Sequence, residues 1–421
     1  MAKASSPLSP GSQVNTFVDD PTSEDESEDD IEMPDSRSVE HANNIHTSNK
    51  HSANNQSEKP TSNKERSPTN RTDSVKDTIQ NGTTVPQADR YGFIGGKEFT
   101  DPEAERRLPI EILRKRELKW LDMFQNWEKW MSKRFKKVKE RCRKGIPPSV
   151  RSRAWQFLCG SKYAMEHNPG KFEEYCRAAG DQRCIDDIKK DLHRQFPLHE
   201  MFMARGGYGQ EDLYRILKAY TVHNPMDGYC QAQAPIAAVL LMHMPAEEAF
   251  WCFVAICEKY IPGYYSPGLE AVQIDGEVLF GLLKRTNPLI YKHLKKHKVE
   301  PILFMTEWFM CVFSRNLPWA CVLRVWDMFL CEGIKVVFRV GLVLVRLCLG
   351  SSEKLAACPG MYETLEKMRQ LPTDLDESFI VRESLRLNLT EREMEKEHQK
   401  QVQRRKAARE RPPSGKAKKK S

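Results

Sequence analysis

The fold class is decided by one apolar stretch, Val322-Leu323-Arg324-Val325-Trp326-Asp327-Met328-Phe329-Leu330-Cys331-Glu332-Gly333. Four of its apolar residues recur at the spacing of one helix face: Val322, Val325, Phe329 and Leu330. Gly333 follows at the position where glycine commonly ends a helix. Trp326 and Asp327 are interpreted as a core residue and a partner in a local hydrogen bond. The stretch therefore predicts a buried helix.

The same periodicity extends through the middle of the chain. All 12 cysteines and all 8 tryptophans lie between Trp120 and Cys358, which locates the core. Alternation of apolar and polar residues, the pattern of a strand, is nowhere sustained. We therefore predict an all-α fold, in one domain of roughly 300 residues. Helices are expected at 108–138, 150–159, 168–178, 182–195, 210–222, 235–243, 246–260, 268–297, 301–314, 318–331, 334–349, 352–370, 375–387 and 391–411.

The formal net charge of +8 is unevenly distributed over the 421 residues. Residues 1–90 hold 9 Lys and Arg against 16 Asp and Glu, whereas residues 391–421 hold 12 against 5. The first segment has a single aromatic residue, Phe17, so we predict an acidic disordered tail that cannot bury enough apolar surface to fold. Its acidic run Ser23–Asp30 is either a solvated tail or a kinase site. The last segment predicts a lone polar helix that frays into a basic end.

Neither a membrane-spanning helix nor a metal site is predicted. The best apolar run, Gly341–Leu349, is too short to cross a bilayer and contains Arg346. The start of the sequence lacks an apolar signal segment and its end lacks a lipidation motif, so we expect a cytoplasmic protein that partners or charge recruit to membranes. The 12 cysteines form no Cys-x-x-Cys pair and no histidine pair completes a zinc site, so we expect buried, reduced thiols.

The first candidate site residues lie on a charged helix expected at 182–195. Its isoleucines form one stripe, and Asp191 and Arg194 fall on the opposite side. Pro197 ends the helix and places Arg194 in its last turn. The simplest interpretation is a cation that complements the helix dipole and pairs with Asp191 at i, i+3.

A polar turn leads into the next apolar helix within Asn224–Pro235. Pro235 suits the first turn of that helix, which places Gln231 at or just before its N-terminus. Backbone N–H groups at such an end favour anions such as phosphate. Cys230 could be a nucleophile there, but no arrangement of histidine and asparagine partners is indicated. A buried structural thiol is the preferred interpretation.

Four motifs, taken together and in order, resemble the TBC domain, the catalytic module of GTPase-activating proteins for Rab-type small GTPases. They are Gly145-Ile146-Pro147 with Arg151 and Trp155; Ile188, Asp191 and Arg194; Tyr229 and Gln231; and Leu317-Pro318-Trp319 with Trp326, Asp327, Phe329, Glu332 and Gly333. Further stretches are similar to the member 10 subgroup, the carabin and Whacked group: Tyr91–Gly96, Gly228–Pro235 and Thr306–Met310. The resemblance covers residues 91–390, as a helical lead-in at 91–140 and a TBC core at 141–390, with both tails outside it.

The resemblance implies an activator that supplies catalytic groups in trans and is not a stand-alone enzyme. Arg194 and Gln231 would be its arginine and glutamine fingers, supported by Asp191 and Tyr229. Four residues would be scaffold: Arg151, Trp155, Trp326 and Asp327. GTP and Mg²⁺ belong to the partner GTPase, so no cofactor is expected. The family usually has Gly-Met after its glutamine, whereas Ala232 follows here and leaves the backbone less free.

The resemblance also implies the partners. We expect a GTP-bound Rab acting in vesicle traffic, with Ras- and Arf-type GTPases as further candidates. The alternative is a catalytically silent, TBC-like scaffold or effector that binds a small GTPase. The basic end of the chain lacks aromatic residues and nucleic-acid motifs, which favours the acidic surface of plasma or vesicle membranes over nucleic acid. Some subgroup members end in a PDZ-binding leucine; this sequence ends in Lys-Lys-Lys-Ser, so that partner is not carried over.

Overall fold

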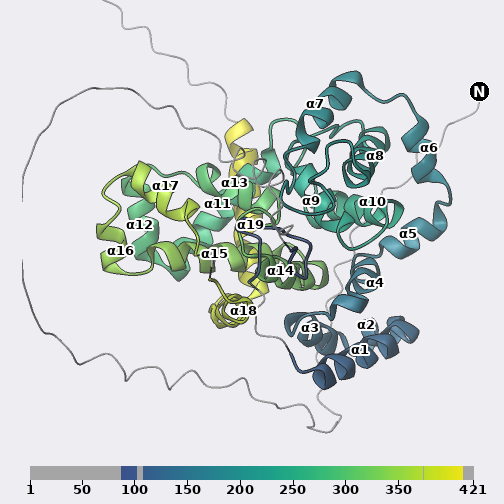
Figure 1. Ribbon diagram of the computed structural model, residues 1–421. Helices are drawn as coiled ribbons and strands as arrows, with labels where there is room; N and C mark the ends of the chain where they lie inside the picture. Colours follow the sequence, from purple (N-terminus) through teal and green to yellow (C-terminus); the bar gives the residue numbers. More distant parts are fainter. Residues whose placement is uncertain (1–86, 102–107, 373, 411–421) are drawn as a thin grey trace, which may run out of the picture. The chain divides into compact units, whose positions relative to one another are not determined.

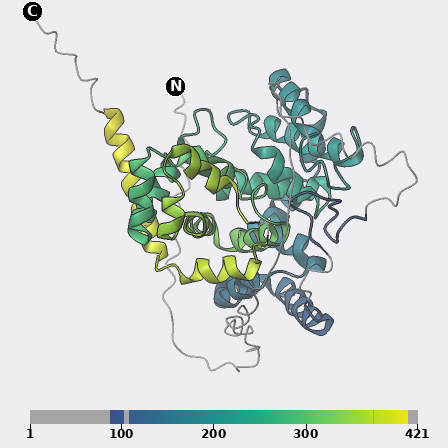
Figure 2. The same ribbon diagram turned by 60° about the vertical axis from the view of Figure 1, so that its left-hand side comes forward.

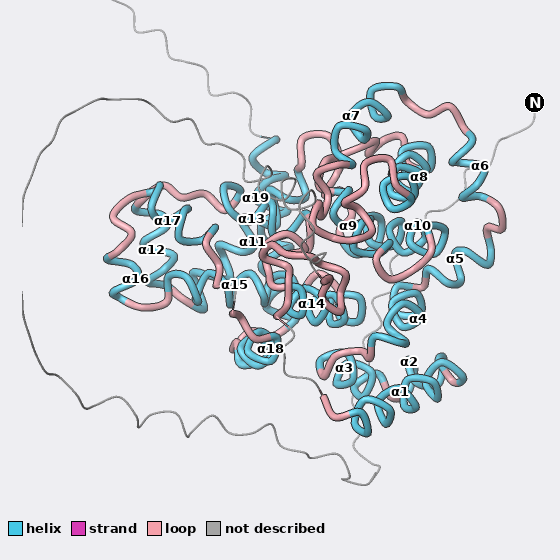
Figure 3. Tube along the Cα trace, viewed as in Figure 1, coloured by secondary structure: helices cyan, strands magenta, loops and turns pink. Residues whose placement is uncertain are grey.

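A computed structural model describes residues 87–101, 108–372 and 374–410. This part of the chain consists of helices joined by turns and loops, and its only β pairing is an isolated bridge between Phe93 and His199 (Figures 1 and 3). The predicted all-α fold is therefore confirmed. The helices are α1 (Ile110–Gln125), α2 (Trp127–Lys133), α3 (Phe135–Arg143), α4 (Pro148–Cys159), α5 (Ser161–His167), α6 (Lys171–Arg177), α7 (Gln182–Leu192), α8 (Tyr208–His223), α9 (Gln233–Leu241), α10 (Ala246–Ala255), the π-helix η2 (Ile256–Tyr260), α11 (Glu270–Thr286), α12 (Pro288–Lys296), α13 (Ile302–Met310), α14 (Trp319–Glu332), α15 (Lys335–Leu349), α16 (Ser352–Ala356), α17 (Met361–Arg369), α18 (Glu377–Arg386) and α19 (Glu391–Glu410).

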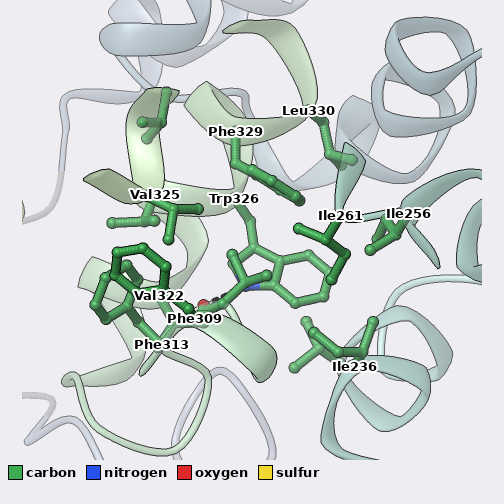
Figure 4. Packing of buried hydrophobic residues seen from close by; sticks show 14 of the residues in the cluster. Ile236, Ile256, Ile261, Phe309, Phe313, Val322, Val325, Trp326, Phe329 and Leu330 are labelled. Carbon is green, nitrogen blue, oxygen red and sulfur yellow. Dashed lines mark hydrogen bonds between the residues drawn. The ribbon is translucent and has the colours of Figure 1, made fainter. Parts of the chain in front are cut away.

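Helix α14 lies at the centre of the core. Trp326 is fully buried, and its indole is surrounded by Ile236 of α9, Ile256 of η2 and Ile261 (Figure 4). Ten of the 14 residues of α14 are buried, which extends the burial well beyond the single predicted face. The helix is therefore covered on most of its circumference, and the prediction of a buried helix is confirmed.

A buried carboxylate joins α14 to α4. Asp327 accepts hydrogen bonds from the Trp155 indole N–H at 2.8 Å and from Arg151 Nε at 3.2 Å. Its second oxygen accepts the backbone N–H of Ile146 at 2.8 Å. Trp155 also packs against Trp326, with ring centroids 5.5 Å apart. The four residues assigned to the scaffold thus meet in the core, where a carboxylate is tolerated because its oxygens are paired.

Three long predicted helices are divided in the structure, and one of them, 352–370, forms α16 and α17. The stretch 268–297 forms α11 and α12, because Pro288 has no N–H to donate to the preceding turn and begins a new helix. The stretch 108–138 falls on α1, α2 and α3, with breaks at Asn126 and Arg134, where φ reaches −125° and −129°. Apolar spacing continues across these breaks, so periodicity alone does not reveal them.

The C-terminal helix α19 is not the lone helix that the sequence predicts, because it packs along α11 (Figures 1 and 2). Met394 of α19 is buried. His398 contacts Asp275 of α11 at 3.3 Å, and Arg405 contacts Glu270 at 3.2 Å. Most of these contacts join polar groups, so the sequence of α19 shows no regular spacing of apolar residues that would predict the packing. The helix therefore extends the folded domain beyond the predicted limit at residue 390.

The folded part also begins before Tyr91, since Asp89 is only 6% exposed. The rest of the predicted N-terminal tail, with the acidic run Ser23–Asp30, lies outside the described residues, as does the basic end 411–421. Among the helices that the structure describes, none is both long enough and apolar enough to cross a membrane.

Candidate functional site

Arg194 lies in the turn after helix α7, two residues beyond the end of the helix at Leu192. Asp181 caps the start of α7 by accepting two backbone N–H groups, at 2.8 and 3.1 Å. At the other end the backbone tightens, because the N–H groups of Arg194 and Gln195 bond to carbonyl oxygens three residues back. The prediction that Arg194 occupies the last helical turn is therefore wrong by two residues.

Asp191 lies on the buried side of α7 with Ile185 and Ile188, so the expectation that it faces away from the isoleucine stripe is wrong. Its side chain is 7% exposed, against 45% for Arg194. One carboxylate oxygen accepts a hydrogen bond from Arg194 Nη2, and the other accepts from the Tyr229 hydroxyl at 2.7 Å. Both oxygens have charged or polar donors, which is why the carboxylate can be buried. Asp191 thereby links the turn after α7 to the turn before α9.

The turn before α9 carries Tyr229 and Gln231. Asp227 fixes this turn by accepting a hydrogen bond from Ser266 Oγ at 2.5 Å. Burial, together with the hydrogen bond to Asp191, raises the pKa of Tyr229, so its phenol stays protonated and donates. Gln231 is exposed two residues before α9 begins. Within the described residues its side-chain amide has no hydrogen-bond partner, so it is available to another molecule.

A pocket of about 220 Å³ opens beside Arg194. Its walls come from three segments: Phe93, Lys97 and Glu98 before α1, residues 194–198 after α7, and Arg315 before α14. Three cationic groups line it with one carboxylate, that of Glu98, whose pKa is raised by burial. This balance suits an anionic group on a partner. Sequence reasoning missed Lys97, Glu98 and Arg315, because isolated charges at these spacings resemble solvated surface residues.

The remaining candidate residues, Cys230 and the four scaffold residues, do not belong to this pocket. Burial raises the pKa of Cys230, which keeps the thiol protonated and argues against a nucleophile. Among the described residues, no group of three or more His, Cys, Asp or Glu side chains is placed to hold a metal ion. The four scaffold residues meet around Asp327, and none of them lines the pocket beside Arg194. The site therefore presents an exposed guanidinium, anchored on a buried carboxylate, and an exposed amide.

Comparison with known proteins places the chain in a family. Residues 148–351 match the Rab-GTPase-TBC domain. The chain is 61% identical over 327 residues to TBC1 domain family member 10B of Mus musculus, covering 77% of this chain and 41% of that protein. It is 48% identical over 331 residues to TBC1 domain family member whacked of Drosophila melanogaster, covering 78% of this chain and 91% of that protein. The chain belongs to the TBC domain family.

The fold agrees with this assignment. The crystal structure of the Chlamydomonas flagellar RabGAP TBC domain superposes with a TM-score of 0.52 at 24% identity, covering 71% of this chain and 98% of that one. The resemblance to the member 10 subgroup, inferred from motifs, is confirmed by the two relatives. The chain spans less than half the length of the mouse relative, 41% of it. Residues 87–101 lie outside the matched domain, which begins at residue 148.

Proposed function

We propose that this chain is a GTPase-activating protein for a Rab-family small GTPase and so regulates vesicle traffic. Arg194 and Gln231 would complete the partner's active site in trans. The observation that carries the proposal is the link through Asp191, whose buried carboxylate accepts from both the Arg194 guanidinium and the Tyr229 hydroxyl. Two turns with exposed polar side chains thereby share one rigid support. Membership of the TBC family supplies the class of partner.

The chemistry of GTP hydrolysis suits these two side chains. The reaction needs charge compensation on the phosphate oxygens and a positioned water, with little covalent chemistry from protein. A guanidinium is permanently charged and forked, which fits the charge that develops on the transferred phosphoryl group. The amide of Gln231 both donates and accepts, so it would contact the phosphate side and orient the water. The GTPase would bind the nucleotide and Mg²⁺, and this chain would need no cofactor.

Asp191 would act on the reaction through Arg194. A free arginine side chain on a surface samples many rotamers, and docking must remove that freedom. The ion pair with Asp191 removes part of it in advance, because the carboxylate is itself fixed by burial and by Tyr229. The Arg194 side chain stays 45% exposed, so the pairing leaves part of it open to phosphate.

Single-turnover GTP hydrolysis by a panel of Rab GTPases, with Ras and Arf proteins included, tests the activity. We expect at least one Rab to hydrolyse GTP faster when the chain is added, by about 10³- to 10⁵-fold if the arginine acts in trans. A GTPase that binds in its GTP form without faster turnover would support the silent scaffold instead. Absence of acceleration across the whole panel would contradict the proposal.

We further propose that this chain is a cytoplasmic protein and that its basic end binds the acidic surface of plasma or vesicle membranes. Residues 400–420 carry ten Lys and Arg against one Glu. Each such cation near an acidic leaflet contributes about 1 kcal/mol. Because α19 packs on α11, a truncation that tests this role must leave α19 intact.

Truncation after Glu410 removes five cations and leaves α19 intact. Sedimentation with vesicles containing phosphatidylserine should then show weaker binding than for the full chain, while binding to neutral phosphatidylcholine vesicles stays low for both. Undiminished binding to the acidic vesicles would dispose of this docking role.

A further inference from the structure

The turn that carries Arg194 is paired with a segment far outside the matched domain, residues 87–101, here called the brace. Two backbone hydrogen bonds of 2.8 Å join the brace to the residues that follow Arg194: Ile94 N–H to the Leu198 carbonyl oxygen, and Glu200 N–H to the Gly92 carbonyl oxygen. They form the isolated bridge of the structure. The brace also supplies one wall of the pocket beside Arg194.

Phe93 fixes the turn from inside. It is 1% exposed and packs edge-on against Phe196, His199 and Trp319, at centroid distances of 6.2, 4.8 and 4.9 Å. Phe196 comes two residues after Arg194 and has a left-handed backbone, with φ at +42°. An L residue holds that conformation only where its surroundings impose it. The ring of Phe93 is part of those surroundings, so the brace helps to set the path of the turn.

His199 and Gly92 lie against each other where the brace meets the turn. His199 is 4% exposed, and its Nδ1 accepts the N–H of Met201 at 3.1 Å. Nε2 therefore carries the proton and donates to the carbonyl oxygen of Tyr91 at 2.8 Å. Gly92 lies against this ring with φ at +91°, and a Cβ added there would be 2.8 Å from Nε2. Only glycine fits at this position without moving the histidine.

Asp89 makes the brace rigid. It is 6% exposed, and its carboxylate accepts three backbone N–H groups. The donors are Tyr91 at 2.8 Å, Phe93 at 2.9 Å and Thr100 at 2.8 Å. Aspartate folds its neighbouring backbone into a turn in this way. A preformed loop can hold the Arg194 turn in one place, which a loose strand of chain could not do.

We propose that the brace positions Arg194 for catalysis, an inference that rests on the proposed GTPase-activating function. Contacts of the brace with Phe196 and His199 determine how the chain leaves α7, and hence where the Arg194 guanidinium is presented. A misplacement on the order of 1 Å costs about 100-fold in rate, so a small shift of this turn is enough to matter. In this role Gly92 and Phe93 act through Arg194, so they are positioning residues.

Gly92→Ala tests the brace, with Gly95→Ala as its matched control. A Cβ at Gly95 would meet no heavy atom within 4 Å, whereas at Gly92 it meets the His199 ring. Each full-length variant is assayed in single-turnover GTP hydrolysis by the Rab that responds to the unmodified chain, over a range of chain concentrations. We expect Gly92→Ala to lower the maximal rate by about 10- to 100-fold and to change the half-saturating concentration by less than about threefold. Gly95→Ala should leave both values unchanged.

Affinity for two forms of the same Rab separates positioning from a merely structural role. GDP with aluminium fluoride mimics the transition state, and a non-hydrolysable GTP analogue mimics the ground state. Gly92→Ala should weaken binding of the first form and spare the second. Phe93→Leu keeps a buried apolar side chain and loses the ring contacts, so this milder variant should shift the same readouts in the same direction.

The outcomes distinguish the brace from the proposed function. Equal weakening of both nucleotide forms, or a maximal rate for Gly92→Ala equal to that of Gly95→Ala, would overturn the role of the brace. Full stimulation by Arg194→Ala would instead overturn the proposed function itself. If Arg194→Ala abolishes stimulation while Gly92→Ala and Phe93→Leu retain it, the proposed role of the brace is refuted and the proposed function stands.

Discussion

Asp191 has more influence on the candidate site than its short side chain suggests. It is the residue that ties the exposed Arg194 to the folded interior, through a carboxylate whose other oxygen accepts from Tyr229. A buried carboxylate with one partner removed is costly, because the freed oxygen is kept from water. Changes at Tyr229 should therefore affect Arg194, because both side chains donate hydrogen bonds to Asp191.

Tyr229→Phe removes the hydroxyl that donates to Asp191 and keeps the ring. We expect the maximal rate of stimulated hydrolysis to fall by about 10-fold, because Asp191 then holds Arg194 less firmly. The free energy of unfolding should fall by about 1–3 kcal/mol. Tyr260→Phe is the control: it removes a hydroxyl that donates to the Leu330 carbonyl oxygen at 2.6 Å, so it should lose stability and keep the rate. An unchanged rate in Tyr229→Phe would count against the Asp191 link.

Gln231→Ala removes the exposed amide before α9. If this side chain orients the attacking water, the maximal rate should fall by about 10²- to 10³-fold, with little change in thermal stability. Gln182→Ala is a suitable control, since Gln182 is an exposed glutamine on α7 whose amide pairs with Asp186. A normal rate for Gln231→Ala would mean that the GTPase uses its own glutamine.

The sequence predicts some of these contacts and not others, for a geometric reason. Asp191 and Arg194 are three residues apart, so helical spacing alone predicts their pairing. Tyr229 is 38 residues from Asp191, and its supporting role comes from the family resemblance, not from any pattern. The prediction that Asp191 lies opposite the isoleucine stripe is wrong, because three residues turn a helix by about 300° and leave Asp191 about 60° from Ile188.

At the scale of elements, the pairing of α19 with α11 shows what apolar periodicity does not detect. α19 contacts α11 through ion pairs such as Arg405 with Glu270, and these residues alone would indicate a solvated helix. His398 faces the buried Asp275, and their hydrogen bond raises the pKa of His398. Polar pairs on two separate helices become visible only when the helices are placed side by side.

Met394→Ala tests whether α19 is an integral part of the domain. Met394 is 4% exposed, and truncation of a buried methionine to alanine costs about 2–5 kcal/mol. Urea unfolding should show a loss of this size. Lys396→Ala, on the exposed side of the same helix, should stay within about 0.5 kcal/mol of the unmodified chain. Equal stability of the two variants would show that α19 contributes nothing to the fold.

At the scale of the whole molecule, distant segments meet at α14 and at the Arg194 turn. The composition and the helical periodicity of the core predict an all-α protein, and four motifs in order predict the family. Neither predicts that Phe93 docks on His199 and Trp319, because the segment around Phe93 is short, rich in glycine and without a period. Such long-range contacts depend on how all the helices assemble.

Two histidines should make the folded chain less stable in mild acid. Burial lowers the pKa of His199, and burial together with the Arg151 guanidinium lowers that of His243 to about 3. Unfolded histidines titrate near 6.5, so below that pH the unfolded chain takes up protons that the folded chain does not. The free energy of unfolding should therefore fall as the pH drops, by up to about 1.4 kcal/mol per pH unit for each histidine.

His243→Phe removes one of these groups while keeping a ring against Trp155, where the centroids are 4.9 Å apart. Urea unfolding at about pH 7 and about pH 5.5 measures the loss. The variant should lose less stability between the two values than the unmodified chain, whereas His167→Ala, at an exposed position, should lose the same amount. An identical loss of stability in the unmodified chain and both variants would show that His243 does not cause the sensitivity to acid.

Single-turnover GTP hydrolysis by the responsive Rab, with the Arg194→Ala and Arg194→Lys chains, tests the central claim most directly. Lys190→Ala is the matched control, because Lys190 on α7 forms an i, i+3 ion pair with Asp187, with side chains 70% and 62% exposed. Both Arg194 variants should fold and lose stimulation by about 10³- to 10⁵-fold, while Lys190→Ala stays fully active. Stimulation by Arg194→Ala equal to that of the unmodified chain would contradict the account.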